Sequence, residues 1–133
     1  TEFDSRRRAV EFAENAKAVA VFEEVPEATH NFVVGLETGQ VAHPVGLAFT
    51  SPKASVGNQR RFELLSGIFD AAGGAMAVLP TRGISRLADQ FEATAWGDHL
   101  SCYLALLRGV DPTPTPSLQR VRAAMAQETA RPT

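Results

Sequence analysis

Residues 75–79, Ala-Met-Ala-Val-Leu, constrain the fold most strongly, because they contain no polar side chain. Gly73 and Gly74 precede this run and Pro80 follows it, and both residue types favour turns. A short apolar run between turn residues predicts a strand. Side chains of a strand alternate between its two faces, so a strand that is apolar throughout must be covered on both. The run therefore predicts an α/β fold: a three-layer α-β-α sandwich with a largely parallel sheet.

Helical and strand-like patterns alternate along the rest of the chain, as this fold requires. Two further strands are predicted, over residues 19–22 and 40–50. Helices are predicted from Asp4 or Ser5 to about Ala18, from Thr29 to Gly35 or Gly39, from about Gln59 to Ala72 with Asn58 as cap, from Ser85 as cap to about Arg108, and after Ser117. The long helix after Ser85 has expected apolar anchors at Leu87, Phe91, Leu100, Leu104 and Leu107, with Trp96 and Tyr103 as core or interface residues.

Residues 111–116 alternate proline with other residues, which predicts a stiff, extended connector before the last helix. The residues from 129 onward are expected to be a disordered tail. The expected organisation is one domain over residues 1–128 and a tail over residues 129–133. Because the chain begins with Thr1 in place of methionine, we expect it to be the C-terminal piece of a longer protein.

The composition excludes several classes of protein. The 133 residues suffice for one domain with a core, and the formal net charge of -2 argues against a basic nucleic-acid surface. A single cysteine, Cys102, excludes an intrachain disulfide and suits a reducing cytosol. One cysteine and three scattered histidines lack the spacing of a metal site. With no membrane-length apolar run and no signal peptide, we expect a cytoplasmic protein whose partner is a small molecule or another protein.

The segment from Glu14 to Asn31 carries the chemistry. Glu14 lies at the edge of the apolar face of the first predicted helix, where we expect it to be partly desolvated, and His30 follows sixteen positions later. A carboxylate and an imidazole can together remove a proton and shuttle one at an oxygen. Each also has an ordinary structural interpretation: Glu14 as a solvated helix pair with Lys17, and His30 as a capping or surface residue.

The run "ENAK … PEATHN" resembles the C-terminal sugar-isomerase (SIS) domain of bacterial and archaeal bifunctional phosphoglucose/phosphomannose isomerases, whose pattern is similar to N-E-N-A-K, a strand and P-E-x-x-H-N. A second stretch, "GDHLSCYLALLRGVDPTP" from Gly97 to Pro114, resembles the closing helix of that family and its exit. The resemblance spans nearly the whole chain, although these two stretches alone are specific. One position departs from the pattern, because Ala13 stands where asparagine is common.

The resemblance implies a SIS fold and interconversion of glucose 6-phosphate or mannose 6-phosphate with fructose 6-phosphate through a cis-enediol. It implies that Glu14 is the catalytic base, that His30 assists ring opening, and that Lys17 and Asn31 bind substrate. It implies no metal and no organic cofactor. In similar isomerases the ring-opening histidine reaches the active site of the neighbouring subunit. The dimeric habit of similar isomerases and the surface of Trp96, Tyr103 and Leu107 predict a homodimer, with the long helix and the last helix near its interface. The pattern leaves open which hexose phosphate is preferred.

Similar isomerases hold the sugar phosphate in a Ser/Thr-rich loop of an N-terminal SIS domain, and this chain has no such loop before its first helix. We therefore expect that N-terminal domain as a partner, and we expect this chain to be inactive alone. Two alternatives to the enzyme remain. The chain could be a non-catalytic sugar-phosphate-binding module, since a fold does not determine a function. It could also be a structural dimerisation domain, whose residues 108–133 embrace a partner.

Overall fold

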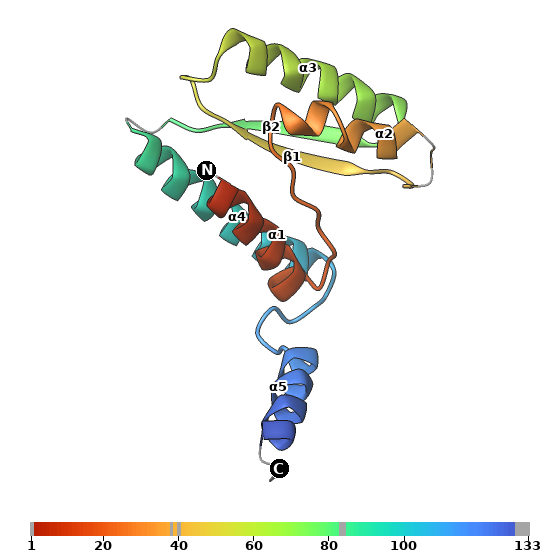
Figure 1. Ribbon diagram of the computed structural model, residues 1–133, viewed down its shortest axis with the longest axis vertical. Helices are drawn as coiled ribbons and strands as arrows, with labels where there is room; N and C mark the ends of the chain where they lie inside the picture. Colours follow the sequence, from red (N-terminus) through yellow and green to blue (C-terminus); the bar gives the residue numbers. More distant parts are fainter. Residues whose placement is uncertain (1, 38, 40, 83–84, 130–133) are drawn as a thin grey trace.

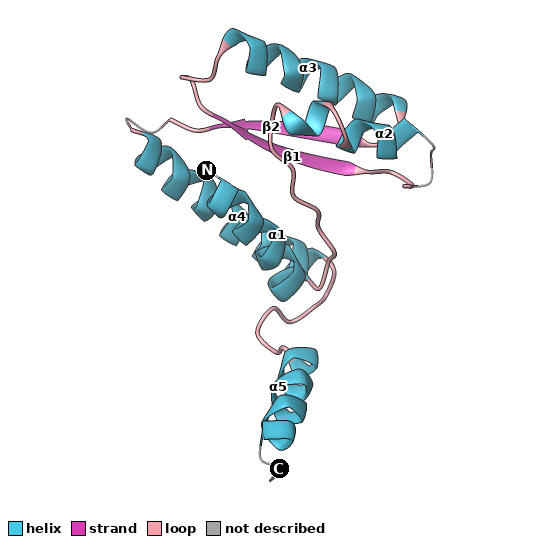
Figure 2. Ribbon diagram, in the orientation of Figure 1, coloured by secondary structure: helices cyan, strands magenta, loops and turns pink. Residues whose placement is uncertain are grey.

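A pair of parallel strands lies between two groups of helices (Figures 1 and 2). The computed structural model describes residues 2–37, 39, 41–82 and 85–129. Strand β1 (Val45–Thr50) pairs with β2 (Ala75–Pro80) in a register that runs from Val45 opposite Ala75 to Thr50 opposite Pro80. The strand predicted over residues 75–79 is confirmed. The predicted strand over residues 40–50 is shorter, because residues 41–44 form bends and a loop before β1.

Helix α3 (Val56–Ala71) makes the crossover that a parallel pair needs. Its buried residues Leu65 and Phe69 belong to the face that contacts the sheet. The contact is close at Gly46, where a Cβ atom would come within 2.9 Å of the Phe69 ring. The predicted cap is wrong: Ser55, which has an extended backbone, accepts a hydrogen bond from the Asn58 backbone N–H, so the helix begins earlier.

Helices lie on both sides of the sheet, as predicted (Figure 2). On one side are α3 and the short helix α2 (Phe32–Glu37), joined by a tilted contact between the Phe32 and Phe69 rings at a centroid distance of 6.2 Å. On the other side are α1 (Glu2–Ala16) and α4 (Arg86–Leu107), which pack against each other. The fold is therefore α/β with a parallel sheet.

The contact between α1 and α4 uses the small residues of α4. Four small buried residues recur at every fourth position along α4: Ala93, Gly97, Ser101 and Ala105. Such spacing places them on one helix face, and their small size lets another backbone approach closely. Asp89, one turn earlier, is also buried, and it accepts a hydrogen bond from the Ser51 Oγ atom at 2.9 Å. The prediction of Leu87, Phe91 and Leu107 as buried anchors is wrong, because all three are exposed. Trp96 and Tyr103 are exposed as well, so neither is a core residue.

The ends of α4 agree with the prediction. Ser85 caps the helix by accepting a hydrogen bond from the Ala88 backbone N–H, and Arg108 is the C-terminal cap. Gly109 follows with a φ of +63°, a left-handed conformation that glycine adopts without strain.

The strand predicted over residues 19–22 does not form. Helix α1 ends at Ala16, earlier than predicted, and Lys17 adopts a φ of +53°. Residues 17–24 then run without regular structure, and Val19 is 97% exposed. A strand needs a neighbour to satisfy its backbone groups, and residues 17–24 pair with neither β1 nor β2. The N-terminal boundary also differs, because α1 already includes the expected caps Asp4 and Ser5.

The last helix, α5 (Pro116–Thr129), projects away from the rest of the fold (Figure 1). It begins at Pro116, a residue earlier than the predicted cap Ser117, because proline is well suited to the first turn of a helix. Thr129, expected to start the tail, ends α5, and residues 130–133 lie outside the described residues.

Candidate active site

Glu14 lies in the last turn of α1, and its side chain is exposed. The expected partial desolvation is therefore wrong for this chain by itself, because α4 covers a different face of α1. The left-handed turn at Lys17 folds the chain back, and the Lys17 Nζ atom donates hydrogen bonds to the backbone oxygens of Glu14 and Pro112. Lys17 therefore joins the end of α1 to the proline-rich connector.

Two further bonds hold the end of α1 against α4. The Asn15 Nδ2 atom donates to the Ser101 Oγ atom at 2.9 Å, and the Arg108 Nη1 atom donates to the Ala16 backbone oxygen at 3.0 Å. The arginine thus satisfies a carbonyl that α1 leaves without a helical partner. Neither of these two hydrogen bonds was predicted from the sequence, because the residues that each bond joins lie 86 and 92 positions apart in the chain. The result is an exposed carboxylate on a well-anchored helix end.

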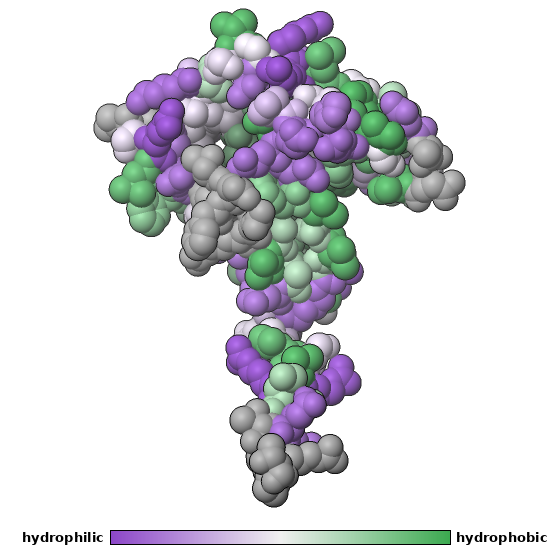
Figure 3. Space-filling view, viewed as in Figure 1, coloured by the Kyte–Doolittle hydropathy of each residue, from purple (hydrophilic) through white to green (hydrophobic). Residues whose placement is uncertain are grey.

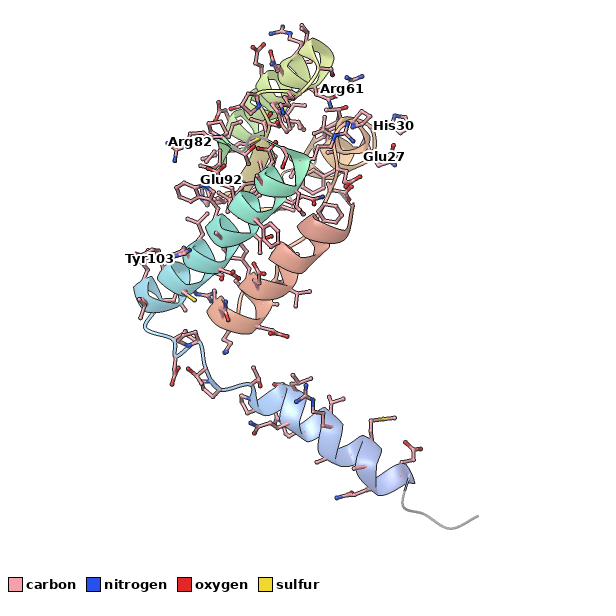
Figure 4. All side chains as sticks on the ribbon, turned by 90° about the vertical axis from the view of Figure 1, so that its left-hand side faces the viewer. Glu27, His30, Arg61, Arg82, Glu92 and Tyr103 are labelled. Carbon is pink, nitrogen blue, oxygen red and sulfur yellow. The ribbon has the colours of Figure 1, made fainter. Side chains whose placement is uncertain are left out.

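His30 follows the 3₁₀ turn η1 (Glu27–Thr29), and its backbone N–H donates to the Glu27 oxygen at 2.8 Å. Its side chain is exposed, and it precedes α2, although it was expected in the first turn of a helix. The Asn31 Nδ2 atom donates to Glu27 Oε1 at 2.9 Å, and Thr29 Oγ1 donates to the Pro26 oxygen at 2.6 Å. Figure 4 shows Glu27 and His30 together at the surface.

The structure does not bring Glu14 and His30 together within one chain. The end of α1 lies near the connector to α5, whereas η1 and α2 lie beyond the sheet beside α3 (Figure 1). Residues 17–26 run from one place to the other. Glu14 stays with Lys17 and His30 stays with Asn31, so the four candidate residues form two separate pairs.

A cavity of about 470 Å³ lies elsewhere, between α3 and the sheet. It is lined by Thr50, Gln59, Phe62, Glu63, Ser66 and Val78. None of the four candidate residues lines it, so it does not complete their site. Within the described part of the chain, no cluster of His, Cys, Asp and Glu side chains could hold a metal ion. No described helix is both long enough and apolar enough to cross a bilayer.

The parallel sheet flanked by helices is the α/β arrangement expected of a SIS domain (Figure 2). Residues 2–125 match the family described as the bacterial phospho-glucose isomerase C-terminal SIS domain, and the chain belongs to this family.

Two curated relatives carry the name bifunctional phosphoglucose/phosphomannose isomerase. The relative from Caldicellulosiruptor bescii is 28% identical over 131 residues, which make up 96% of this chain and 38% of that protein. The relative from Aquifex aeolicus is 29% identical over 110 residues, or 82% of this chain and 34% of that protein. The chain thus spans little more than a third of their length. No solved structure matches it.

Proposed function

We propose that this chain is the C-terminal domain of a sugar-phosphate aldose–ketose isomerase that interconverts glucose 6-phosphate or mannose 6-phosphate with fructose 6-phosphate. The observation that carries the proposal is the exposed Glu14 carboxylate on an anchored helix end, within the segment that matches the isomerase family. Anchoring matters because a general base must keep its position relative to the reacting carbon.

Glu14 moves a proton between C1 and C2 of the open-chain sugar through a cis-enediol. The adjacent carbonyl acidifies the C–H bond, so a carboxylate suffices as base, and the proposal includes neither a metal nor an organic cofactor. His30 transfers a proton at the ring oxygen and opens the cyclic sugar. Lys17 and Asn31 bind sugar oxygens. Each already has a hydrogen-bond partner, Pro112 for Lys17 and Glu27 for Asn31, which a substrate oxygen would replace.

The active site is shared between chains in this proposal. Glu14 and His30 lie at opposite ends of the α/β body, so Glu14 of one chain is completed by His30 of another. An N-terminal SIS domain supplies the phosphate-binding loop in this proposal, because the chain spans little more than a third of the length of its curated relatives. The functional assembly is then a homodimer of two-domain chains, inactive when reduced to this domain.

The test replaces Glu14 by glutamine in the two-domain protein. We expect turnover to fall by roughly 10²–10⁴-fold, because the amide cannot accept the proton. The measurement is the rate of fructose 6-phosphate formation from each aldose phosphate. Glu23→Gln, an exposed carboxylate in the loop after α1, is the matched control and should keep its activity. Near-normal turnover by Glu14→Gln on both substrates would remove Glu14 from the mechanism.

The alternative is a non-catalytic sugar-phosphate-binding module. It is favoured by the separation of the candidate residues, none of which lines the cavity beside α3. Titration of glucose 6-phosphate into the two-domain protein, together with the turnover assay, separates the two functions. Saturable binding without turnover would select the module.

A further inference from the structure

Lys17 has two hydrogen-bond acceptors that belong to different parts of the fold. Its Nζ atom donates to the Glu14 backbone oxygen within the last turn of α1, and it donates at 3.1 Å to the Pro112 oxygen in the proline-rich connector. The first bond spans 3 positions of the chain and the second spans 95. The second bond therefore ties the connector, and with it α5, to the helix end that carries Glu14.

In the described part of the chain, the connector has few other ties to the body of the fold. The Val110 N–H donates to the Ala105 oxygen at 2.9 Å, which closes the end of α4. Beyond it, the Thr113 N–H donates to Asp111 Oδ1 at 2.9 Å, within the connector itself. Figure 3 shows the connector as a narrow neck between the α1–α4 body and α5. The bond from Lys17 is thus well placed to control how firmly the connector is held.

The Asp111 carboxylate orders the turn that presents the Pro112 oxygen. Its bond with the Thr113 N–H is the pattern by which an Asp side chain closes a turn on the backbone two residues on. Pro114 favours an extended Thr113, because proline disfavours helical backbone in the residue before it. Asp111 is exposed and has no role in the proposed chemistry. Its removal therefore loosens the connector without touching the proposed site.

We propose that a bound sugar phosphate and the connector compete for the Lys17 ammonium group, so that binding frees the connector and α5 from the end of α1. This inference rests on the proposed function, in which Lys17 binds the sugar phosphate. Hydrogen bonds from an ammonium group are stronger to an anionic ligand than to a neutral carbonyl oxygen. The Pro112 oxygen gives way, because moving the connector breaks that bond, whereas losing the Glu14 oxygen would require α1 to unwind.

The coupling acts in both directions. A ligand that breaks the bond between Lys17 and Pro112 loses the free energy of that bond, so a weaker bond raises the affinity of the ligand. The net free energy of one neutral hydrogen bond corresponds to roughly a two- to tenfold change in an equilibrium constant. Any change that releases α5 therefore increases the affinity for the sugar phosphate, and the proposed site is regulated from the C-terminal helix.

The first test measures the binding of fructose 6-phosphate to the two-domain protein by titration calorimetry, with Glu14→Gln in every variant so that the sugar is not converted. Asp111→Ala should lower the Kd roughly two- to tenfold, because Lys17 loses its competing acceptor. Asp70→Ala, which removes an exposed carboxylate on α3, is the matched control and should leave the Kd unchanged. Lys17→Met should raise the Kd, and Asp111→Ala should then have no further effect. An unchanged Kd in Asp111→Ala, or an equal gain without Lys17, would overturn the proposal.

The second test measures rapid amide hydrogen exchange of residues 109–116 with and without saturating fructose 6-phosphate. The sugar phosphate should accelerate exchange at Thr113 by roughly twofold or more, and it should have no effect in Lys17→Met.

The two tests separate the failure of this inference from the failure of the proposed function. Unchanged exchange at Thr113, although calorimetry detects binding, would overturn the coupling and leave the proposed isomerase standing, because an ammonium group has a third N–H for the ligand. Near-normal turnover by Glu14→Gln would remove the proposed base, while the exchange measurement would still decide the coupling. The absence of any binding of the sugar phosphate would overturn both.

Discussion

The bond between Ser101 and Asn15 allows a quantitative test of how α4 anchors the end of α1 that carries Glu14. Ser101 is 0% exposed, its Oγ atom donates to the Asp98 backbone oxygen at 3.0 Å, and it accepts the bond from Asn15. Ser101→Ala removes both interactions. A neutral hydrogen bond contributes about 0.5–1.5 kcal/mol net, and a buried donor left without a partner costs about 1–3 kcal/mol.

Asn15 is half-buried, so water can reach its amide. The cost of leaving that amide without its protein partner therefore lies at the lower end of its range. We therefore expect Ser101→Ala to lower the free energy of unfolding by about 1–2 kcal/mol. The measurement is urea denaturation followed by circular dichroism, with stability compared at equal m-values. Cys102→Ala, the exposed neighbour on α4, should stay within about 0.5 kcal/mol of the unmodified chain.

A double-mutant cycle then isolates the bond. Asn15→Ala should also be destabilising, and the double variant should lose less than the sum of the two single losses by about 1 kcal/mol. If the loss of the double variant equals the sum of the two single losses within about 0.5 kcal/mol, the bond between Asn15 and Ser101 does not anchor α1. In the proposed two-domain isomerase Ser101→Ala should also lower turnover, because Glu14, the proposed base, is the residue before Asn15.

Three further outcomes are expected. Gly46→Ala should lower the free energy of unfolding by about 1–3 kcal/mol, because its Cβ atom would lie 2.9 Å from the Phe69 ring. Adding Phe69→Leu should recover part of that loss in the same denaturation assay. If no stability is recovered, the contact with Phe69 is not the cause of the loss. Ser55→Ala should cost about 1 kcal/mol through loss of the α3 cap, and an unchanged urea midpoint would contradict the role of this hydroxyl. Mixing inactive Glu14→Gln and His30→Ala two-domain chains should restore roughly a quarter of the full activity, because half of the dimers are mixed and each holds one intact site of two. Mixtures that stay inactive although native mass spectrometry detects subunit exchange would refute the shared site.

Local features of the fold were predictable from short stretches of sequence. The apolar run at residues 75–79 became β2, Ser85 became the cap of α4, and proline and glycine marked the connector and the end of α4. In each case the cause lies within a few residues: a cap bonds the N–H three positions on, and a proline constrains its own φ. The family and the positions of Glu14 and His30 within its motif were likewise readable from the sequence, although their roles stay a proposal.

Tertiary structure decided which apolar residues are buried and which candidate residues can meet. Phe91 and Leu107 have the composition of core residues, yet α4 turns its small residues toward α1, because two helix backbones approach closely only where side chains are short. Residues 19–22 have strand-forming side chains, but a strand exists only when a neighbour accepts its hydrogen bonds, and that neighbour is determined by the whole fold. The distance between Glu14 and His30 depends in the same way on the path of residues 17–26, which no local pattern specifies.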